Sequence, residues 1–407
     1  MASPLGGAWQ EINLDALRLN LESVRAAVGP GVRIAAVVKA DAYGHGMVEC
    51  ARALWDAGAD VIATASVREA LYLKHLGVFG AVSPKGETRG PAALWSMGYA
   101  PDDLLAAAIV NGIALTVCDV GQARRLGETA MSRGLTAHAH VKIDTGFHRL
   151  GMTIDEARAD LPGILSMPGL AVDGVFTHLA LIDEDHDRAQ MDRFFSVAQP
   201  LADSSGRGPC LHAADSIAAF RYPKWRLGMV RVGAILYGNV IADAPFIPRK
   251  VMRLCARIVS TRTIQPGEGV GYDGTYRATR ETIIAAIPLG YADGLPRRLR
   301  ERGQASVRGV RVRYAGLPCM DQSMLDVTDV PGIQVGDIVT ALGGEGEDVI
   351  PVEEFAAWIG SNRNEPLAMT GRRVPRAYYQ NGEIVSVDDP LLDGFMAQTS
   401  FPQHIHP

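Results

Sequence analysis

The sequence lacks several features that would assign it to particular protein classes. Only 5 of its 407 residues are cysteine, they are widely scattered, and no CxxC pair occurs. This argues against a disulfide framework and favours reduced thiols in a cytoplasmic protein. No apolar run is long enough to cross a membrane. Residues 1–10 also lack the basic start and apolar block of a signal peptide.

An excess of positive charge is absent as well. The chain carries 40 Lys and Arg residues against 45 Asp and Glu residues, which gives a net charge of −5. The densest basic run, Arg297–Arg302, is best interpreted as solvated surface, so nucleic acid is not an expected partner. What the chain does have is 47% hydrophobic residues, enough for a large core, and a length that suits a barrel plus a second domain.

From about residue 33 to residue 237, short β-branched runs alternate with amphipathic stretches. A capping-box pattern at Ser66–Glu69 predicts one helix start, and Gln190–Ala202 predicts another helix. The number and spacing of the strands are those of a (β/α)8 TIM-like barrel, an α/β fold. The candidate strands are Ile34–Lys39, Val61–Ser66, Gly80–Ser83, Leu115–Asp119, Ala137–Asp144, Val172–His178, Cys210–Asp215 and Met229–Leu236.

After Asn239 the pattern changes to strands and turns, with one helical segment at Val352–Ile359. We therefore predict a barrel over residues 12–244 and a mainly β C-terminal domain over residues 245–400, with residues 1–11 as a candidate addition to the second domain. The candidate strands of that domain are Leu254–Thr263, Thr282–Pro288, Ala305–Val312, Gly332–Leu342 and Ala377–Val387.

Reactive side chains stand where the barrel strands end, as expected for a site at the carboxyl face of such a barrel. The first strand ends in Lys39, followed by Ala-Asp-Ala-Tyr43-Gly-His-Gly. A lysine that closes a buried strand is costly to desolvate, and a Schiff base would remove that cost. From spacing alone, a lysine that merely reaches solvent is an equally good interpretation.

The fifth strand carries the run His140-Val-Lys142-Ile-Asp144-Thr-Gly-Phe-His-Arg149-Leu-Gly151. The planar fork of Arg149 suits a carboxylate ligand, but an ion pair between Asp144 and Arg149 is an open alternative. A lone strand-end histidine such as His178 is more often a core residue than a functional one.

The last two barrel strands add further candidates. The seventh is followed by Asp215-Ser216, and the eighth reads Met-Val-Arg231-Val-Gly233-Ala234. Arg231 lies in an otherwise apolar strand and therefore needs a partner.

The second domain has its own motifs. Gly269-Val-Gly271-Tyr272-Asp-Gly274 matches GxGxxG, which is weak as a dinucleotide motif because no βαβ unit follows. Tyr291, Met320, Asp321 and the run Arg372-Arg373-Val-Pro-Arg376 lie further on, and each alone would be read as a turn or packing residue.

These motifs together, and in this order, resemble those of the alanine racemases, which are barrel-type (fold type III) pyridoxal-phosphate enzymes. The resemblance extends from about Trp9 to Val387. It implies a pyridoxal 5'-phosphate-binding barrel and an isomerase that interconverts L- and D-alanine. It also implies two catalytic bases on opposite faces of Cα, namely Lys39, which also binds the cofactor, and Tyr272.

The resemblance assigns further roles residue by residue. Arg231 would face the pyridine nitrogen, where a fixed cation discourages protonation of the ring. Lys142 is a candidate for carbamylation, no metal is implied, and Tyr272 and Met320 would act across a homodimer with shared active sites. The implied cofactor contacts are Lys39, Tyr43, His178, Ser216, Arg231, Gly233 and Ala234, and the implied substrate contacts are Arg149, Tyr291, Met320 and Asp321.

Two positions depart from the family pattern. Asp215 stands where asparagine is usual, and its charge could raise neighbouring pKa values or pair with Arg231. Arg372 stands where some members have tyrosine. These departures leave a serine or broad-spectrum racemase open as an alternative substrate class. A non-catalytic cofactor-binding regulator is a third alternative, against which Tyr272 and Met320 speak.

Overall fold

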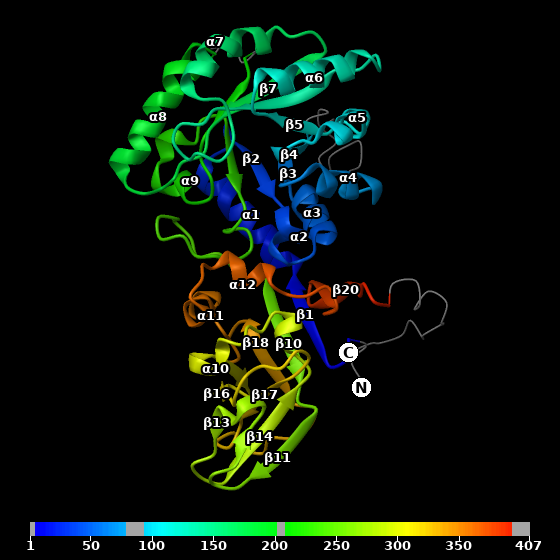
Figure 1. The fold of residues 1–407 in the computed structure, drawn as a ribbon, viewed down its shortest axis with the longest axis vertical. Coiled ribbons are helices and arrows are strands. Elements are labelled where there is room, and N and C mark those ends of the chain that lie inside the picture. Colours follow the sequence, from blue (N-terminus) through cyan, green and yellow to red (C-terminus); the bar gives the residue numbers. More distant parts are fainter. Residues whose placement is uncertain (1–4, 79–92, 202–207, 393–407) are drawn as a thin grey trace. The chain divides into compact units, whose positions relative to one another are not determined.

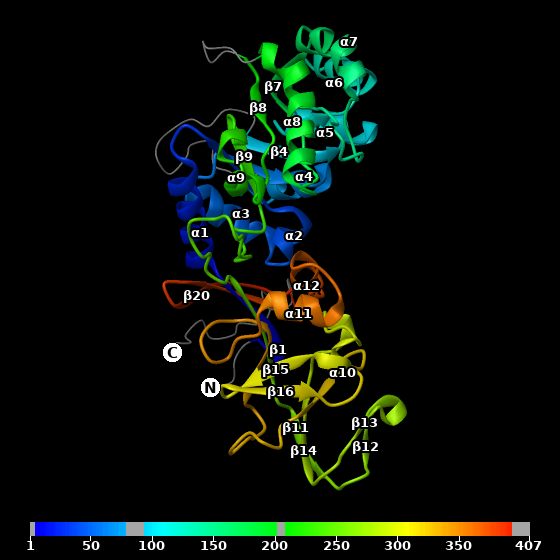
Figure 2. The ribbon, with the colours of Figure 1, turned by 90° about the vertical axis from the view of Figure 1, so that its left-hand side faces the viewer.

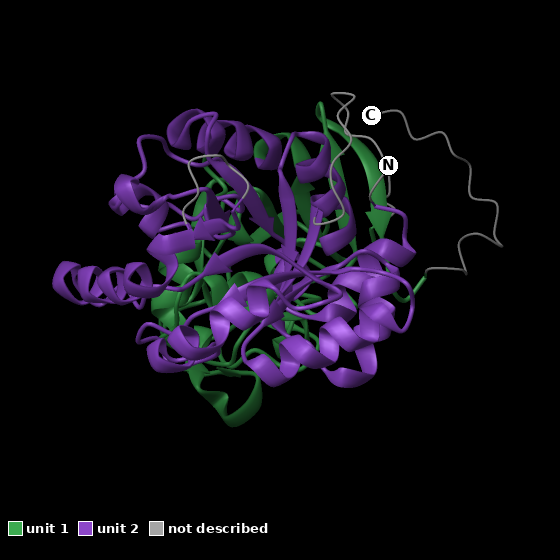
Figure 3. Ribbon diagram, turned by 90° about the horizontal axis from the view of Figure 1, so that it is seen from above, with its two compact units in different colours: residues 1–16, 43–46, 250–407 green, residues 17–42, 47–249 purple. Residues whose placement is uncertain are grey.

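The computed structural model describes residues 5–78, 93–201 and 208–392 (Figure 1). The candidate strand Gly80–Ser83 lies outside these residues. The chain forms two compact units (Figure 3). Unit 1 comprises residues 1–16, 43–46 and 250–407, and unit 2 comprises residues 17–42 and 47–249. No described helix has both the length and the apolar character needed to cross a bilayer.

Unit 2 contains a parallel eight-stranded sheet in the order β8-β7-β6-β5-β4-β3-β2-β9. A bridge between Asp215 and Arg231, with Arg231 N donating to Ala214 O at 3.0 Å, brings the two ends of the sheet together. The predicted barrel is thus confirmed. The strands are β2 (Arg33–Val37), β3 (Val61–Thr64), β4 (Leu94–Tyr99), β5 (Ala114–Val117), β6 (Ala137–Lys142), β7 (Leu170–Phe176), β8 (Cys210–His212) and β9 (Met229–Val232).

Strand β4 was not among the predicted strands. Its sequence has no β-branched residue and contains Gly98, so its local strand propensity is weak. Packing compensates for this: Trp95 is fully buried, donates from Nε1 to Thr116 Oγ1 at 3.1 Å and stacks on His140 at 4.4 Å. The barrel interior, rather than local preference, therefore determines this strand.

Helices alternate with the barrel strands. The capping box at Ser66 and Glu69 is present at the start of α4. Helix α8 begins earlier than predicted because the Asp183 side chain caps it, accepting from His186 N at 2.8 Å. The helices are α1 (Leu14–Val28), α2 (Lys39–Tyr43), α3 (Met47–Asp56), α4 (Val67–His75), α5 (Asp102–Val110), α6 (Val120–Met131), α7 (Ile154–Leu165), α8 (Glu184–Ala198) and α9 (Ala218–Arg221), with short 3-10 turns η2 (Gln199–Leu201) and η3 (Pro223–Trp225).

Unit 1 is built on a mostly antiparallel ten-stranded sheet in the order β11-β14-β17-β16-β15-β18-β10-β1-β19-β20. Strand β1 (Ala8–Asn13) pairs with β10 and β19, so the start of the chain belongs to this sheet. The other strands are β10 (Met252–Arg257), β11 (Ser260–Ile264), β14 (Thr282–Ile287), β15 (Gln304–Val307), β16 (Val310–Tyr314), β17 (Ser323–Asp326), β18 (Ile338–Gly343), β19 (Arg376–Gln380) and β20 (Glu383–Asp388).

Smaller elements complete unit 1. A separate two-stranded ribbon, β12 (Gly269–Val270) and β13 (Tyr276–Arg277), flanks the turn η4 (Tyr272–Gly274), as Figure 2 shows. The predicted helix is present as α11 (Val352–Ile359). The remaining elements are η5 (Tyr291–Asp293), α10 (Leu299–Arg302) and α12 (Asn364–Ala368).

Candidate active site

The carboxyl ends of the unit 2 strands gather a group of residues that we call the strand-end site. Burial lowers the pKa of Lys39, and Arg149 lowers it further. Burial also lowers the pKa of Lys142 to about 8, with Arg231 and Arg149 adding to the effect. Lys39, Lys142, Arg149 and Arg231 therefore share one electrostatic environment, although they come from distant parts of the sequence. The site consists of Lys39, Lys142, Arg149, His178, Ser216 and Arg231.

The segment after Lys39 is a left-handed turn. Residues 40–43 have φ between 52° and 55°, a region that costs roughly 1–2 kcal/mol for each residue with a side chain. The Glu69 carboxylate stabilises the turn by accepting from Ala40 N and Ala65 N, each at 2.8 Å. Tyr43 closes the turn and is grouped with unit 1. Sequence reasoning identified Glu69 only as a helix cap, because its bond to residue 40 spans a long stretch of chain.

The loop that carries Arg149 is built around Asp144. Asp144 Oδ1 accepts from the backbone N–H groups of Gly146, Phe147 and His148 at 2.9–3.1 Å. Burial opposes ionisation of Asp144, but these three donors hold its pKa below the ordinary value. The Arg149 guanidinium lies over the Phe147 ring at 4.4 Å. In the part of the chain that is described, the ion pair between Asp144 and Arg149 is not formed, so Asp144 shapes the loop instead.

Arg231 is a buried cation held by neutral groups. Its Nη1 donates to His212 Nδ1 at 2.9 Å, and its Nη2 donates to the carbonyl oxygens of Thr177 and Ala213 at 2.9 and 2.7 Å. Among the described residues no carboxylate forms an ion pair with it. Burial lowers the pKa of His178 to about 2, and Arg231 is the second cause. His178 is therefore neutral at physiological pH.

Beside Arg231 lies a small group of hydroxyl and backbone donors. Gly233 N donates to the buried Ser216 Oγ at 3.0 Å. This leaves the Ser216 hydroxyl hydrogen to point elsewhere, since the oxygen is the acceptor in that bond. Ala234 follows Gly233 directly, just after the end of β9. Hydroxyl and N–H groups next to several cations form a favourable environment for an anion.

The Asp215 side chain forms hydrogen bonds mainly with the backbone. Its Oδ1 accepts from Ile217 N and Ala218 N, both at 2.9 Å, at the start of α9. No ion pair joins it to Arg231 within the described contacts, but its charge raises the pKa of both Arg231 and Lys39. An asparagine could make the same backbone contacts without that charge.

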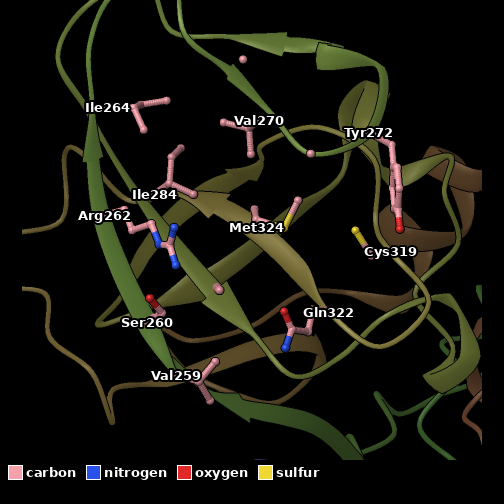
Figure 4. A pocket seen from close by; sticks show the side chains of 13 residues that line it. Val259, Ser260, Arg262, Ile264, Val270, Tyr272, Ile284, Cys319, Gln322 and Met324 are labelled. Atoms are coloured by element: carbon pink, nitrogen blue, oxygen red, sulfur yellow. The ribbon is translucent and has the colours of Figure 1, made fainter.

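The candidate residues of unit 1 are more exposed. Tyr272 is 66% exposed, Met320 53% and Tyr291 43%. Tyr272 and Cys319 lie along one wall of a hollow of about 790 Å³, on the face of the sheet shown in Figure 4. Arg372 is exposed and makes no side-chain hydrogen bond among the described contacts.

Two turns of unit 1 are joined through their backbones. Tyr291 N donates to Cys319 O at 2.9 Å, and Ala292 N donates to Met320 O at 3.0 Å. This close approach requires glycine at position 290, where an added Cβ would lie 2.3 Å from Met320 O. The turns that present Tyr291 and Met320 therefore form one local structure.

An acidic segment begins a barrel helix. Asp183–Asp187 forms the cap and first turn of α8. Asp187 is buried and accepts from the Tyr222 hydroxyl at 2.9 Å. A polar sequence does not reveal such a partner, because the tyrosine belongs to a distant segment.

Comparison with known families agrees with this architecture. A family model described as the alanine racemase N-terminal domain matches residues 12–240, and one for the alanine racemase C-terminal domain matches residues 251–378. The chain belongs to the alanine racemase family. The family predicted from the motifs is therefore confirmed.

Individual relatives in this family cover nearly the whole chain. The alanine racemase of Desulforamulus reducens is 38% identical over 91% of this chain and 98% of its own length. The solved alanine racemase of Clostridium difficile 630 is 32% identical with a TM-score of 0.85, covering 96% of this chain and 99% of that one. The solved alanine racemase of Bartonella henselae, with covalently bound pyridoxal phosphate, is 25% identical with a TM-score of 0.80 and covers 92% of this chain and all (100%) of that one.

Proposed function

We propose that this protein is a pyridoxal 5'-phosphate-dependent racemase that interconverts L- and D-alanine. The observation that carries the proposal is Lys39, a partly buried lysine of lowered pKa that lies among other cations just after barrel strand β2. A lysine in such an environment holds a larger fraction of the neutral amine, which is the form that reacts with an aldehyde. Membership of the alanine racemase family supports alanine as the substrate.

The strand-end site fits the cofactor. Its cations complement a phosphate, and the Ser216 hydroxyl and the Ala234 N–H offer donors for the phosphate oxygens. Gly233 N would exchange its bond to Ser216 Oγ for one to the phosphate. Arg231, which has only neutral acceptors, can face the pyridine nitrogen, and the neutral His178 can lie beside the ring. Tyr43 is the further phosphate contact, and Lys39 is the covalent attachment point. When bound, pyridoxal phosphate stabilises negative charge at the substrate Cα.

The remaining chemistry belongs to the chain itself. Arg149 binds the substrate carboxylate with its planar fork, and Met320 and Asp321 contact the same end of the substrate. Lys39 Nζ takes or returns the Cα proton on one face, and the Tyr272 hydroxyl does so on the other. Two bases invert a stereocentre more directly than one base that must change sides. Tyr291 lines the substrate entrance.

The division of labour is part of the proposal. The barrel, residues 12–244, binds the cofactor, and the domain of residues 245–400, with residues 1–11, supplies Tyr272 and Met320 to the site of a second copy in a homodimer. The exposure of Tyr272 and Met320 supports this arrangement, because side chains that act on a partner must reach out from their own domain. Lys142 is proposed as a carbamylation site, supported by its lowered pKa. Five free cysteines support a cytoplasmic location.

Isotope exchange tests the function directly. The holoenzyme is incubated with L-alanine, D-alanine and L-serine separately in D₂O, and Cα deuteration and the opposite enantiomer are followed. We expect fast inversion of alanine with deuterium in the product. Preference for serine would contradict the proposed substrate. Exchange without inversion would show that one of the two bases is missing.

Subunit mixing tests the shared site. Lys39→Ala and Tyr272→Phe subunits are each expected to be inactive as homodimers. After random exchange, mixed dimers hold one complete site each, so we expect about a quarter of wild-type activity. Activity no higher than that of either parent would argue against shared active sites.

A further inference from the structure

The Arg373 guanidinium connects two turns that the proposed function places at the substrate. Its Nε donates to Asp293 Oδ1 at 2.6 Å, and its Nη2 donates to Asp321 Oδ1 at 2.6 Å, to Asp293 Oδ2 at 3.2 Å and to Met320 O at 3.4 Å. One side chain therefore contacts both turns at once. We call Tyr291, Asp293, Met320, Asp321 and Arg373 the turn cluster.

The Asp293 side chain shows why this arginine is needed. It is only 6% exposed, and besides Arg373 it accepts from Gly290 N at 2.9 Å. A carboxylate buried to this degree must be paired to remain ionised. Arg373 supplies that pairing, and its other nitrogen extends to the more exposed Asp321, whose side chain is 62% exposed.

The segment just before Arg373 also binds the Tyr291–Asp293 turn. Gly371 N donates to Asp293 O at 3.3 Å, so the backbone just before Arg373 is tied to the same turn that its side chain binds. The bonds from Tyr291 N and Ala292 N to the opposite turn complete a closed set of contacts. Among the described contacts, the pairing of β14 with β17 and the Ser323 hydroxyl, which donates to Leu289 O at 2.7 Å, join the bases of the two turns. Arg373 is the side chain that joins their outer parts, where Tyr291, Met320 and Asp321 lie.

We propose that Arg373 is a positioning residue that fixes Met320 and Asp321 relative to Tyr291, so that the substrate carboxylate meets a preformed surface. This inference rests on the proposed function, which assigns these residues to substrate binding. A lysine could not replace the arginine, because a single ammonium group lacks the fork that reaches two carboxylates and a carbonyl together.

Arg308 offers a matched control in the same unit. Its side chain is 38% exposed, against 39% for Arg373, and it likewise binds one well-buried carboxylate, Asp337, at 2.9 Å and one carbonyl, Pro331 O, at 3.1 Å. Arg308 contacts no member of the turn cluster within the described residues. R308K should therefore lose comparable ion-pair energy without disturbing the substrate surface.

The experiment compares wild type, R373K and R308K as holoenzymes. We expect R373K to raise KM for alanine about tenfold and to change kcat by less than about twofold, because a binding contact shared by ground and transition states is weakened. Hydrogen exchange followed by mass spectrometry should show faster exchange in the peptide containing Tyr291 and Ala292. R308K should show neither effect.

A second variant keeps the test decisive if R373K folds poorly. D321N leaves the buried pair of Asp293 and Arg373 intact, so unit 1 should remain folded, and it should also speed exchange at Tyr291 and Ala292. Unchanged exchange in both variants, or an active R373K with unchanged KM, would overturn the positioning role while leaving the proposed function standing. A wild-type protein that inverts no alanine would overturn both.

Discussion

The strand-end site of unit 2 and the turn cluster of unit 1 hold their charges in opposite ways. In unit 2, the buried Arg231 is bound by two carbonyls and a histidine, and its pKa is lowered to about 10 by burial. In unit 1, Arg373 is bound by two carboxylates, and its pKa is raised by them. In the first arrangement no described carboxylate contacts the cation directly, although the charge of Asp215 acts on it, whereas in the second two carboxylates contact and neutralise it.

The two ways of holding charge suit two different tasks, namely binding and reacting with a ligand, and fixing the positions of chain segments. Uncompensated cations favour an anionic ligand and keep a neighbouring lysine partly neutral, which suits a site that binds a phosphate and reacts through an amine. Compensated charges fix the positions of chain segments and add little net field. The proposed function thus assigns reactivity to unit 2 and positioning to unit 1, with the exposed Tyr272 as the exception that it places at a partner's site.

The largest effect that would test this comparison is expected at Lys39. Lys39→Ala should reduce racemisation by at least about 10⁴-fold, because the variant loses both a base and the attachment point. Borohydride reduction and peptide mass spectrometry should show no cofactor on the chain. Lys74→Ala is the control, since burial also lowers the pKa of Lys74 but no strand-end cation contributes. Substantial activity in Lys39→Ala would contradict the proposal that the strand-end site carries the reactive groups.

Tyr272→Phe should have the next largest effect. Loss of one of two bases should lower kcat by about 10²–10³-fold, and D₂O experiments should show Cα exchange persisting without inversion. Tyr276→Phe is the matched control on the adjacent strand, because its hydroxyl donates to Asp326 Oδ2 at 2.7 Å within unit 1. Normal inversion by Tyr272→Phe would show that Tyr272 is not a catalytic base. Unit 1 would then have a purely positioning role.

Arg231→Lys should affect stability. Replacing the fork leaves two carbonyls and His212 without their buried donor, which should cost about 2–4 kcal/mol in the free energy of unfolding. Urea denaturation of the apoenzyme measures this. Arg226→Lys, whose arginine also donates to two carbonyls, at 2.7 and 3.1 Å, but is less buried, should lose less. Equal losses in the free energy of unfolding for the two variants would show that the deeper burial of Arg231 does not add to the cost of its replacement.

The smallest effect concerns a paired charge inside unit 2. The hydrogen bond from His138 Nδ1 to Asp173 at 2.9 Å raises the pKa of His138, whereas burial lowers the pKa of His140 to about 3. A raised folded-state pKa stabilises the fold fully below about pH 6.5 and loses that contribution as the pH rises through the folded value.

His138→Gln should therefore destabilise the protein by up to about 1 kcal/mol at pH 5.5 and much less at pH 9. Chemical denaturation at the two pH values measures the difference. If His138→Gln destabilised the protein equally at both pH values, the protonated imidazole paired with Asp173 would not be the source of the stabilisation.

The sequence allowed much of the strand-end site to be predicted. Lys142 and Arg231 lie in strands, and Lys39 lies just after one that ends at Val37, two residues earlier than predicted. The apolar pattern of each strand is local, so the approximate positions follow from periodicity and from the rule that barrel chemistry lies at the carboxyl ends of strands. Strand β4 was missed because its local propensity is weak and its stability comes from packing.

The roles of the supporting residues were less predictable. Glu69 has the local signature of a helix cap, and only the fold shows that it also binds Ala40 N. Asp144 and Arg149 are spaced for an ion pair, but competition from three backbone donors gives Asp144 another role. Spacing along a chain cannot decide between partners when several are within reach.

The sequence by itself determined the family and the barrel followed by a β domain, and it named the candidate reactive residues. Hydrophobic periodicity, strand ends and the order of motifs can all be read from short segments of the chain. Tertiary structure alone decided which charges are compensated. Arg231 and Arg373 are both arginines near strands or turns, yet one meets neutral acceptors and the other meets Asp293 and Asp321. Their partners lie tens of residues away, and the energy of a charge depends on what surrounds it in space rather than on its neighbours in the chain.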